Sequence, residues 1–203
     1  GSNNGTTSRN LSIANSPVDA ESQLIRVVGA CGNTTIKNVN LTSNALNTPL
    51  NFPIEFTARK TAADLDYAPN GCHVDNCDIT TQTGGNSQNV LFRQVSATGK
   101  SLTPGTAIDN VTVTSNTITG IYVAVNLGLV ANATVSNNRI SMACVSNSYQ
   151  PNGIQHNKSN GTTGWTVNIH GNKFLLWDNV STSNNRGLGA QVQLDPATAS
   201  PLT

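Results

Sequence analysis

Charged residues are scarce in this chain, and neither sign dominates. Of its 203 residues, 11 are Lys or Arg and 10 are Asp or Glu, so the formal net charge is +1. A protein without a basic excess has no electrostatic field that attracts nucleic acid or anionic lipid. We therefore expect no nucleic-acid partner.

Aromatic side chains and long apolar runs are also lacking. Aromatic residues make up 4% of the chain. No apolar stretch approaches the roughly 20 residues that a membrane-spanning helix needs, so the sequence predicts no membrane span. Asn, Thr, Ser and Gly are abundant instead, a composition that suits β-structure with polar corners better than long helices.

Cysteine and histidine give no sign of a metal site. The three histidines occupy different positions of the repeat described below, and no cysteine pair has zinc-ligand spacing with a nearby histidine. We therefore predict no metal ligands. Cys72 falls at a core position and is interpreted as a small apolar side chain, while a disulfide between Cys31 and another cysteine remains open.

One short phrase keeps returning along the chain. It reads VTVTSNTI at 111–118, ATVSNNRI at 133–140 and VNIHGNKF at 167–174. Each copy has two apolar residues two positions apart, then a polar turn that carries Asn, then another apolar residue. This pattern predicts a strand, a sharp corner and the start of the next strand.

The central apolar residue of each copy recurs about every 20 residues, which is typical of a solenoid. Val135 is then expected to lie over Val113 in a shared dry interior. The copies around Ile54 and Ile154 fit least well. The recurring residues are Ile13, Ile36, Ile54, Val74, Phe92, Val113, Val135, Ile154 and Ile169.

A column of asparagines stands two positions after these residues. Asn tolerates left-handed backbone, and stacked amide side chains can hydrogen-bond along a stack. The column therefore predicts a structural Asn ladder at a corner between strands, formed by Asn15, Asn38, Asn76 and Asn137.

The phrases at 111–118 and 133–140 resemble the repeats of right-handed parallel β-helix proteins of the pectin-lyase-like superfamily. This superfamily includes polysaccharide lyases and hydrolases, phage tailspikes and bacterial surface proteins. The resemblance implies an all-β, right-handed parallel β-helix of about eight to nine coils of roughly 20 residues. We expect one domain over 1–203, with its core at about 11–176. The runner-up fold, a pilin-like β-sandwich, explains neither the Asn column nor the period.

The chain begins Gly1-Ser2 without Met, and neither terminus has the sequence of a strong solenoid cap. We therefore expect it to be a segment of a longer chain, with flanking domains of the same protein or a homo-oligomer covering the ends.

The position after each central residue is predicted to point outward. With turns about 4.8 Å apart, it places Lys37, Glu55, Asp75 and Arg93 in one stripe of charge. The simplest interpretation is an exposed ionic ladder. The functional alternative is ligand binding or, by resemblance to the enzymes of the superfamily, catalysis by Glu55, Asp75 and Arg93, with a Ca²⁺ site in the lyase case. Lys37 and Arg93 favour ionised carboxylates, which disfavours a general acid.

Trp177 is the best candidate for stacking on a sugar ring, because a pyranose has an apolar face of C–H groups. The equally open alternative is that Trp177 covers the end of the core.

Two functions remain. The first is a noncatalytic, secreted β-helix segment of an adhesin, another surface protein or a virion fibre, which presents an elongated face for carbohydrate binding or protein contact. Its expected partner is a glycan or cell-surface polysaccharide, and its expected location is extracellular, at the cell surface or in a virion. The second is a polysaccharide lyase or glycoside hydrolase of the same fold. The chain lacks the Asn-Thr-Asp, Asp-Asp, Gly-His-Gly and Arg-x-Asp-Pro phrases of those enzymes, so we expect no catalysis and no cofactor.

Overall fold

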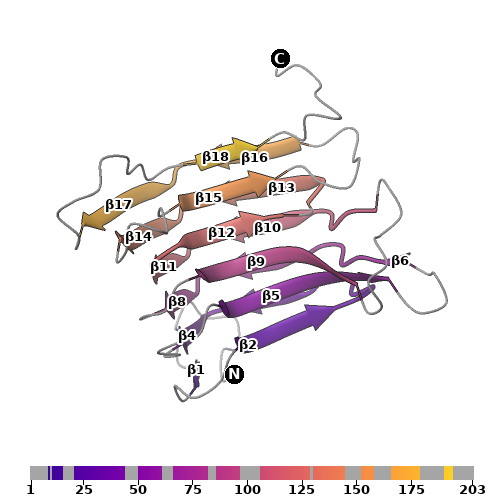
Figure 1. Cartoon of the computed structure of the whole chain (residues 1–203), viewed down its shortest axis with the longest axis horizontal. Coiled ribbons are helices and arrows are strands. Elements are labelled where there is room, and N and C mark those ends of the chain that lie inside the picture. The colour runs from indigo at the N-terminus through magenta and orange to yellow at the C-terminus, as the bar shows by residue number, and fades with distance from the viewer. Residues whose placement is uncertain are drawn as a thin grey trace.

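The computed structural model describes residues 9, 11–15, 21–43, 50–60, 66–81, 86–96, 106–128, 130–144, 152–157, 166–178 and 190–193. In these ranges every regular element is a β-strand, as the sequence predicts (Figure 1). No helix in the described part of the chain has the length and hydropathy that crossing a membrane requires.

The strands form three sheets, which we number 1 to 3. Sheet 1 contains, in spatial order, β16 (Thr166–His170), β13 (Asn132–Ser136), β10 (Val111–Thr114), β7 (His73–Asp75) and β3 (Thr35–Lys37). Sheet 2 contains β1 (Leu11–Ala14), β4 (Val39–Ser43), β8 (Asp78–Thr81), β11 (Thr117–Gly120), β14 (Arg139–Cys144) and β17 (Lys173–Asp178). Sheet 3 contains β18 (Ala190–Gln193), β15 (Asn152–Asn157), β12 (Val123–Leu127), β9 (Asn86–Ser96), β5 (Leu50–Lys60) and β2 (Glu21–Val28), and β6 (Asp66–Tyr67) joins β5.

The chain visits the three sheets in a fixed order. From β3 to β18 it passes from sheet 1 to sheet 2 to sheet 3 and back again, and only the short β6 departs from this order. We call one such circuit a pass. Each strand inside a sheet therefore pairs with strands of the previous and the next pass, and all described pairs except β5 with β6 are parallel. The architecture is all-β with stacked parallel strands, which is compatible with a β-helix (Figure 1).

The core lies between the sheets and is formed by the inward-facing apolar side chains of successive passes. Val113 lies beside Val135 in parallel register, and both side chains are fully buried, which confirms the predicted stacking. On sheet 3, Phe56 and Phe92 are likewise neighbours in the parallel register, and their rings stack with centroids 5.0 Å apart. Each such side chain contributes about 1.5–3 kcal/mol when it leaves water.

The predicted period of about 20 residues is not confirmed. At the corner after sheet 1, residues that are hydrogen-bonded between neighbouring passes are 38, 39, 22 and 34 positions apart along the chain. The predicted column mixes residues of different sheets: Ile54, Phe92 and Ile154 belong to sheet 3, and Ile13 belongs to sheet 2. Alternating apolar residues occur on all three sheets, so a search for apolar spacing cannot separate one sheet from the next.

The corner between sheets 1 and 2 is built on left-handed backbone. Asn38, Asn76 and Asn137 have φ of 58°, 49° and 57°, and Ser115 and Gly171 hold the same position in their passes with 58° and 66°. Asn is tolerated here because its side chain hydrogen-bonds locally.

The predicted Asn column is brought together only in part. Asn76 donates from Nδ2 to Oδ1 of Asn38 at 2.8 Å. Asn15 does not belong to this corner, because it follows β1 of sheet 2 and its backbone N–H faces the carbonyl of Thr42.

A second asparagine ladder lies one residue further on and inside the corner. Asn138 Oδ1 accepts hydrogen bonds from the backbone N–H and from Nδ2 of Asn116, at 2.9 and 3.0 Å. Asn138 in turn donates from Nδ2 to the Val113 carbonyl at 2.9 Å and to Oδ1 of Asn172 at 2.9 Å. Asn116 and Asn138 are each 1% exposed, so these amides satisfy backbone groups that have no access to water.

Replacement of Asn138 tests this inner ladder. We expect Asn138→Ala to lower the free energy of unfolding by about 2–5 kcal/mol, because it leaves the buried Asn116 N–H without its acceptor and removes the side-chain bonds to the Val113 carbonyl and to Asn172. Urea denaturation measures the loss. The neighbouring Asn137→Gly is the control: Asn137 is exposed, and glycine accepts its positive φ, so this variant is expected to change stability by less than about 1 kcal/mol. Equal losses in the two variants would contradict a role specific to the inner amide.

One histidine is part of the core. His156 lies beside Leu127 in the register of sheet 3 and is 1% exposed. Its Nε2 lies 3.3 Å from the carbonyl oxygen of Val130. Burial lowers the pKa of His156 from its ordinary value, and the contact with the Val130 carbonyl opposes this only partly. The neutral imidazole is therefore the form that the fold stabilises.

The lowered pKa of His156 determines how the stability of the fold changes with pH. Because the unfolded chain binds this proton more readily, stability is complete above the ordinary histidine pKa of 6.5 and is lost as the pH falls below it. We expect His156→Leu to remove this loss between pH 7 and pH 5, as measured by the urea midpoint. His170→Gln, which replaces an exposed histidine, is expected to keep the wild-type slope. A wild-type midpoint that rises on acidification would contradict the assignment.

Candidate functional site

The four charged residues predicted to form one stripe lie on two different sheets. Lys37 and Asp75 are on β3 and β7 of sheet 1, where Nζ and Oδ2 are 3.0 Å apart. Glu55 and Arg93 are on β5 and β9 of sheet 3. The single stripe is therefore not formed, and Glu55 and Asp75 do not form a carboxylate pair.

Glu55 is the centre of a buried ion-pair cluster. Its side chain is fully buried, and its Oε1 accepts hydrogen bonds from Arg93 Nε and from Thr57 Oγ1, both at 2.7 Å. Arg26 approaches the other oxygen, with Nε 3.5 Å from Oε2. The Arg93 guanidinium also lies 4.8 Å from the centroid of the Phe52 ring. The two arginines thus enclose one carboxylate, an arrangement that links three neighbouring strands.

Unequal burial of the two ion pairs predicts unequal effects on stability. Removing one partner of a buried pair leaves an uncompensated charge and costs about 3–5 kcal/mol, whereas an exposed pair contributes about 0–1 kcal/mol. Because Arg26 and Arg93 are partly solvated, we expect Glu55→Ala to cost about 2–4 kcal/mol. Asp75→Ala, whose partner Lys37 is half exposed, is expected to cost less than about 1 kcal/mol. Denaturation of the two variants side by side checks this, and a larger loss in Asp75→Ala would refute the ranking.

The remaining predicted positions do not assemble a reactive centre. Trp177 lies in β17 with its backbone beside Ala143, but its side chain is outside the described residues. Burial raises the pKa of the Cys72 thiol to about 12, so this cysteine is protonated and packs as a core side chain. Cys31 and Cys77 are free thiols. In the described ranges, no three His, Cys, Asp or Glu side chains gather closely enough to hold a metal ion.

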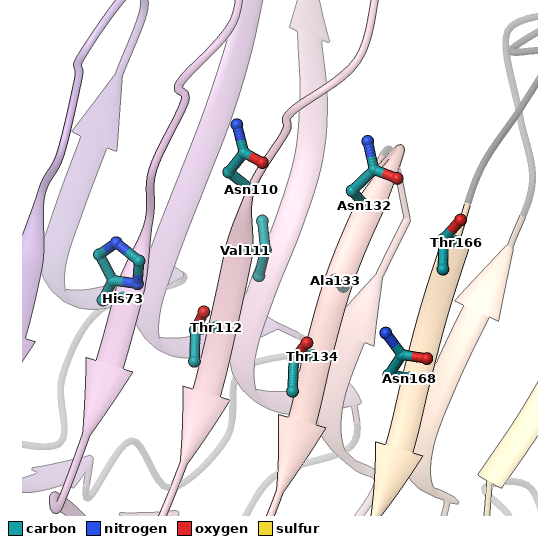
Figure 2. Close-up of a pocket in the computed structure, with 9 residues that line it drawn as sticks. All are labelled: His73, Asn110, Val111, Thr112, Asn132, Ala133, Thr134, Thr166 and Asn168. Atoms are coloured by element: carbon teal, nitrogen blue, oxygen red, sulfur yellow. The ribbon is translucent and has the colours of Figure 1, made fainter.

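A groove of about 420 Å³ lies on sheet 1, across four neighbouring strands, and most of its side chains are uncharged and polar (Figure 2). The residues that line it are His73, Asn110, Val111, Thr112, Asn132, Ala133, Thr134, Thr166 and Asn168.

The parallel register arranges the polar side chains in rows. His73, Thr112, Thr134 and Asn168 come from β7, β10, β13 and β16 and occupy equivalent positions of successive passes. Parallel strands are about 4.8 Å apart, so the row offers a similar polar group at each step. Val111 and Ala133 alternate with these residues and are buried, so their strands form the floor of the groove.

The second row contains Asn110, Asn132 and Thr166, and its amides are fixed by the preceding pass. Asn110 donates from Nδ2 to Oδ1 of Asn70 at 2.8 Å, and Asn132 donates from Nδ2 to Oδ1 of Asp109 at 2.8 Å. The hydroxyl, amide and imidazole groups of the two rows can donate and accept hydrogen bonds along an extended ligand. None of the nine lining residues is a carboxylate.

Sequence reasoning missed this groove, although a signal was present. The alternation of Val111-Thr112-Val113-Thr114 places the threonines on the face opposite the core. The repeat aligns His73 with Thr112, because each directly precedes a recurring apolar residue. The predicted column nevertheless placed Phe92 between Val74 and Val113, so only the register shows that Thr112 lies beside His73.

In comparisons with known proteins, no family model, curated protein or solved structure matches this chain. The functional argument therefore rests on the site.

Proposed function

We propose that this chain is a noncatalytic segment of an extracellular right-handed parallel β-helix, of the pectin-lyase-like type, and that the sheet 1 groove binds a glycan. The fixed visiting order of the three sheets supports the β-helix, and the strong preference of parallel crossovers for one hand supports right-handedness. The resemblance of the repeat phrases supports the superfamily.

The groove carries the functional proposal. Its volume is within the range of small-ligand sites, and it crosses strands, so it suits an extended chain better than a compact molecule. Its hydroxyl and amide groups match the hydroxyls of sugars, which both donate and accept hydrogen bonds. Because similar polar groups recur on each strand of the groove, they also suit a polymer whose own units repeat.

The placement of the carboxylates supports a noncatalytic role over the lyase or hydrolase alternative. Glycoside hydrolysis needs two carboxyl groups on either side of one bond, whereas Glu55 and Asp75 belong to different sheets and each is paired with a cation. A surface, adhesin or virion-fibre setting agrees with a chain that presents such a groove on an exposed sheet.

Polysaccharide binding without turnover is the expected outcome. We expect affinity gel electrophoresis against a panel of soluble polysaccharides to show retardation by at least one member. Thr112→Val, which removes one hydroxyl from the centre of the groove, is expected to weaken that binding about 3- to 10-fold, the effect of one hydrogen bond of about 0.5–1.5 kcal/mol.

Thr114→Val is the matched control. Thr114 lies on the same strand two residues further on and does not line the groove. Removal of its hydroxyl should therefore leave polysaccharide binding unchanged. Reducing-end and ultraviolet assays on the same mixtures should detect no cleavage. Turnover that Glu55→Gln abolishes would establish the enzyme instead.

A further inference from the structure

We infer that the sheet 1 groove selects neutral, hydroxyl-rich glycans and discriminates against glycans that carry carboxylate or sulfate groups. This inference rests on the glycan-binding function proposed above and adds the class of glycan. It follows from which atoms of the groove are already engaged and which face the ligand.

The fixed amides of the groove present acceptors. Asn110 and Asn132 both use Nδ2 to bond the preceding pass, and no described residue donates to their Oδ1 atoms. Figure 2 shows these oxygens on the side of the next strand. A sugar hydroxyl or amide N–H can donate to such an oxygen, whereas a carboxylate or sulfate offers only acceptors.

A carboxylate reinforces this selection at the rim. Asp109 precedes Asn110, and its Oδ1 accepts from the Asn110 backbone N–H at 2.8 Å and from Asn132 Nδ2 at 2.8 Å. In the described part of the chain no Lys or Arg forms an ion pair with Asp109. Among the described residues, no paired cation offsets its negative charge at the groove, which disfavours an anionic ligand.

The ion pair of Asp75 with Lys37 on sheet 1 does not reverse this field. Asp75, two residues after His73, is paired with Lys37 at 3.0 Å, so the two charges largely cancel. Among the described residues, the groove thus combines acceptor oxygens, rotatable hydroxyls and one rim carboxylate, Asp109, that has no ion-pair partner in the described ranges.

The test uses neutral polysaccharides and their charged derivatives with the same backbone. Dextran, xylan and galactomannan are each compared with their carboxymethyl and sulfate forms at pH 8 and low ionic strength, by affinity electrophoresis or calorimetry. We expect Thr112-sensitive binding to at least one neutral polymer and about tenfold weaker binding, or none, to its two charged forms. Added salt should narrow the difference, because it screens Asp109.

Asp109→Asn is the decisive variant. The substituted amide keeps an oxygen that accepts from Asn110 and Asn132 but loses the charge. We expect it to strengthen binding of the charged forms about 3- to 10-fold while binding of the neutral polymer changes less than twofold. Asp78→Asn, which removes the same charge from β8 of sheet 2, is the control for net charge and should change neither. Thermal denaturation of both variants verifies folding.

The outcomes separate the two proposals. If no polymer of the panel shows Thr112-sensitive binding, the glycan-binding function is rejected, and the selectivity with it. If a carboxymethyl or sulfated form binds in a Thr112-sensitive manner as tightly as its neutral parent, the function stands and the selectivity is wrong. An equal gain for charged ligands in Asp78→Asn and Asp109→Asn would likewise overturn the role of Asp109.

Discussion

The constraint on which the rest of this structure depends is the inner asparagine ladder at the corner between sheets 1 and 2. A corner of a few residues turns backbone groups toward the interior, where water cannot reach them. Asn116, Asn138 and Asn172 satisfy those groups and each other, pass by pass. Because each amide also bonds the preceding pass, the ladder sets the register between passes, and the register sets which side chains become neighbours on every sheet.

That register explains the properties of both faces. In the core, the register places similar side chains next to each other, so that Val113 packs on Val135 and Phe56 packs on Phe92. Outside, it turns scattered polar residues into rows, and the groove on sheet 1 is made of two such rows. Lys37 and Asp75 lie on sheet 1, whereas Glu55 and Arg93 lie on sheet 3, so each carboxylate is neutralised by a nearby cation instead of lying beside the other carboxylate. The rows of the sheet 1 groove therefore depend on the register between passes, whereas the separation of Glu55 from Asp75 depends on the sheets to which their strands belong.

Much of the local structure could be predicted from the sequence. The alternation in 111–118 and 133–140 predicted a strand, a corner and a second strand in each copy. The similarity of the two copies predicted that they stack in parallel. Asn38, Asn76 and Asn137 were placed at a corner, and they have left-handed backbone there. The inner ladder was missed by one position: Asn137 and Asn138 are adjacent, and only one of them turns inward. The coil length was misjudged because apolar alternation is the same on every sheet, and because loops of different length intervene between passes.

The sequence by itself determined that this chain forms short strands with buried apolar faces joined at asparagine corners, since these depend on local backbone preferences and on a period of two. Only the tertiary structure decided which strands lie side by side. That choice depends on hydrogen bonds between passes 22 to 39 residues apart, and it alone brings His73, Thr112, Thr134 and Asn168 into one row and places Asp109 at its rim.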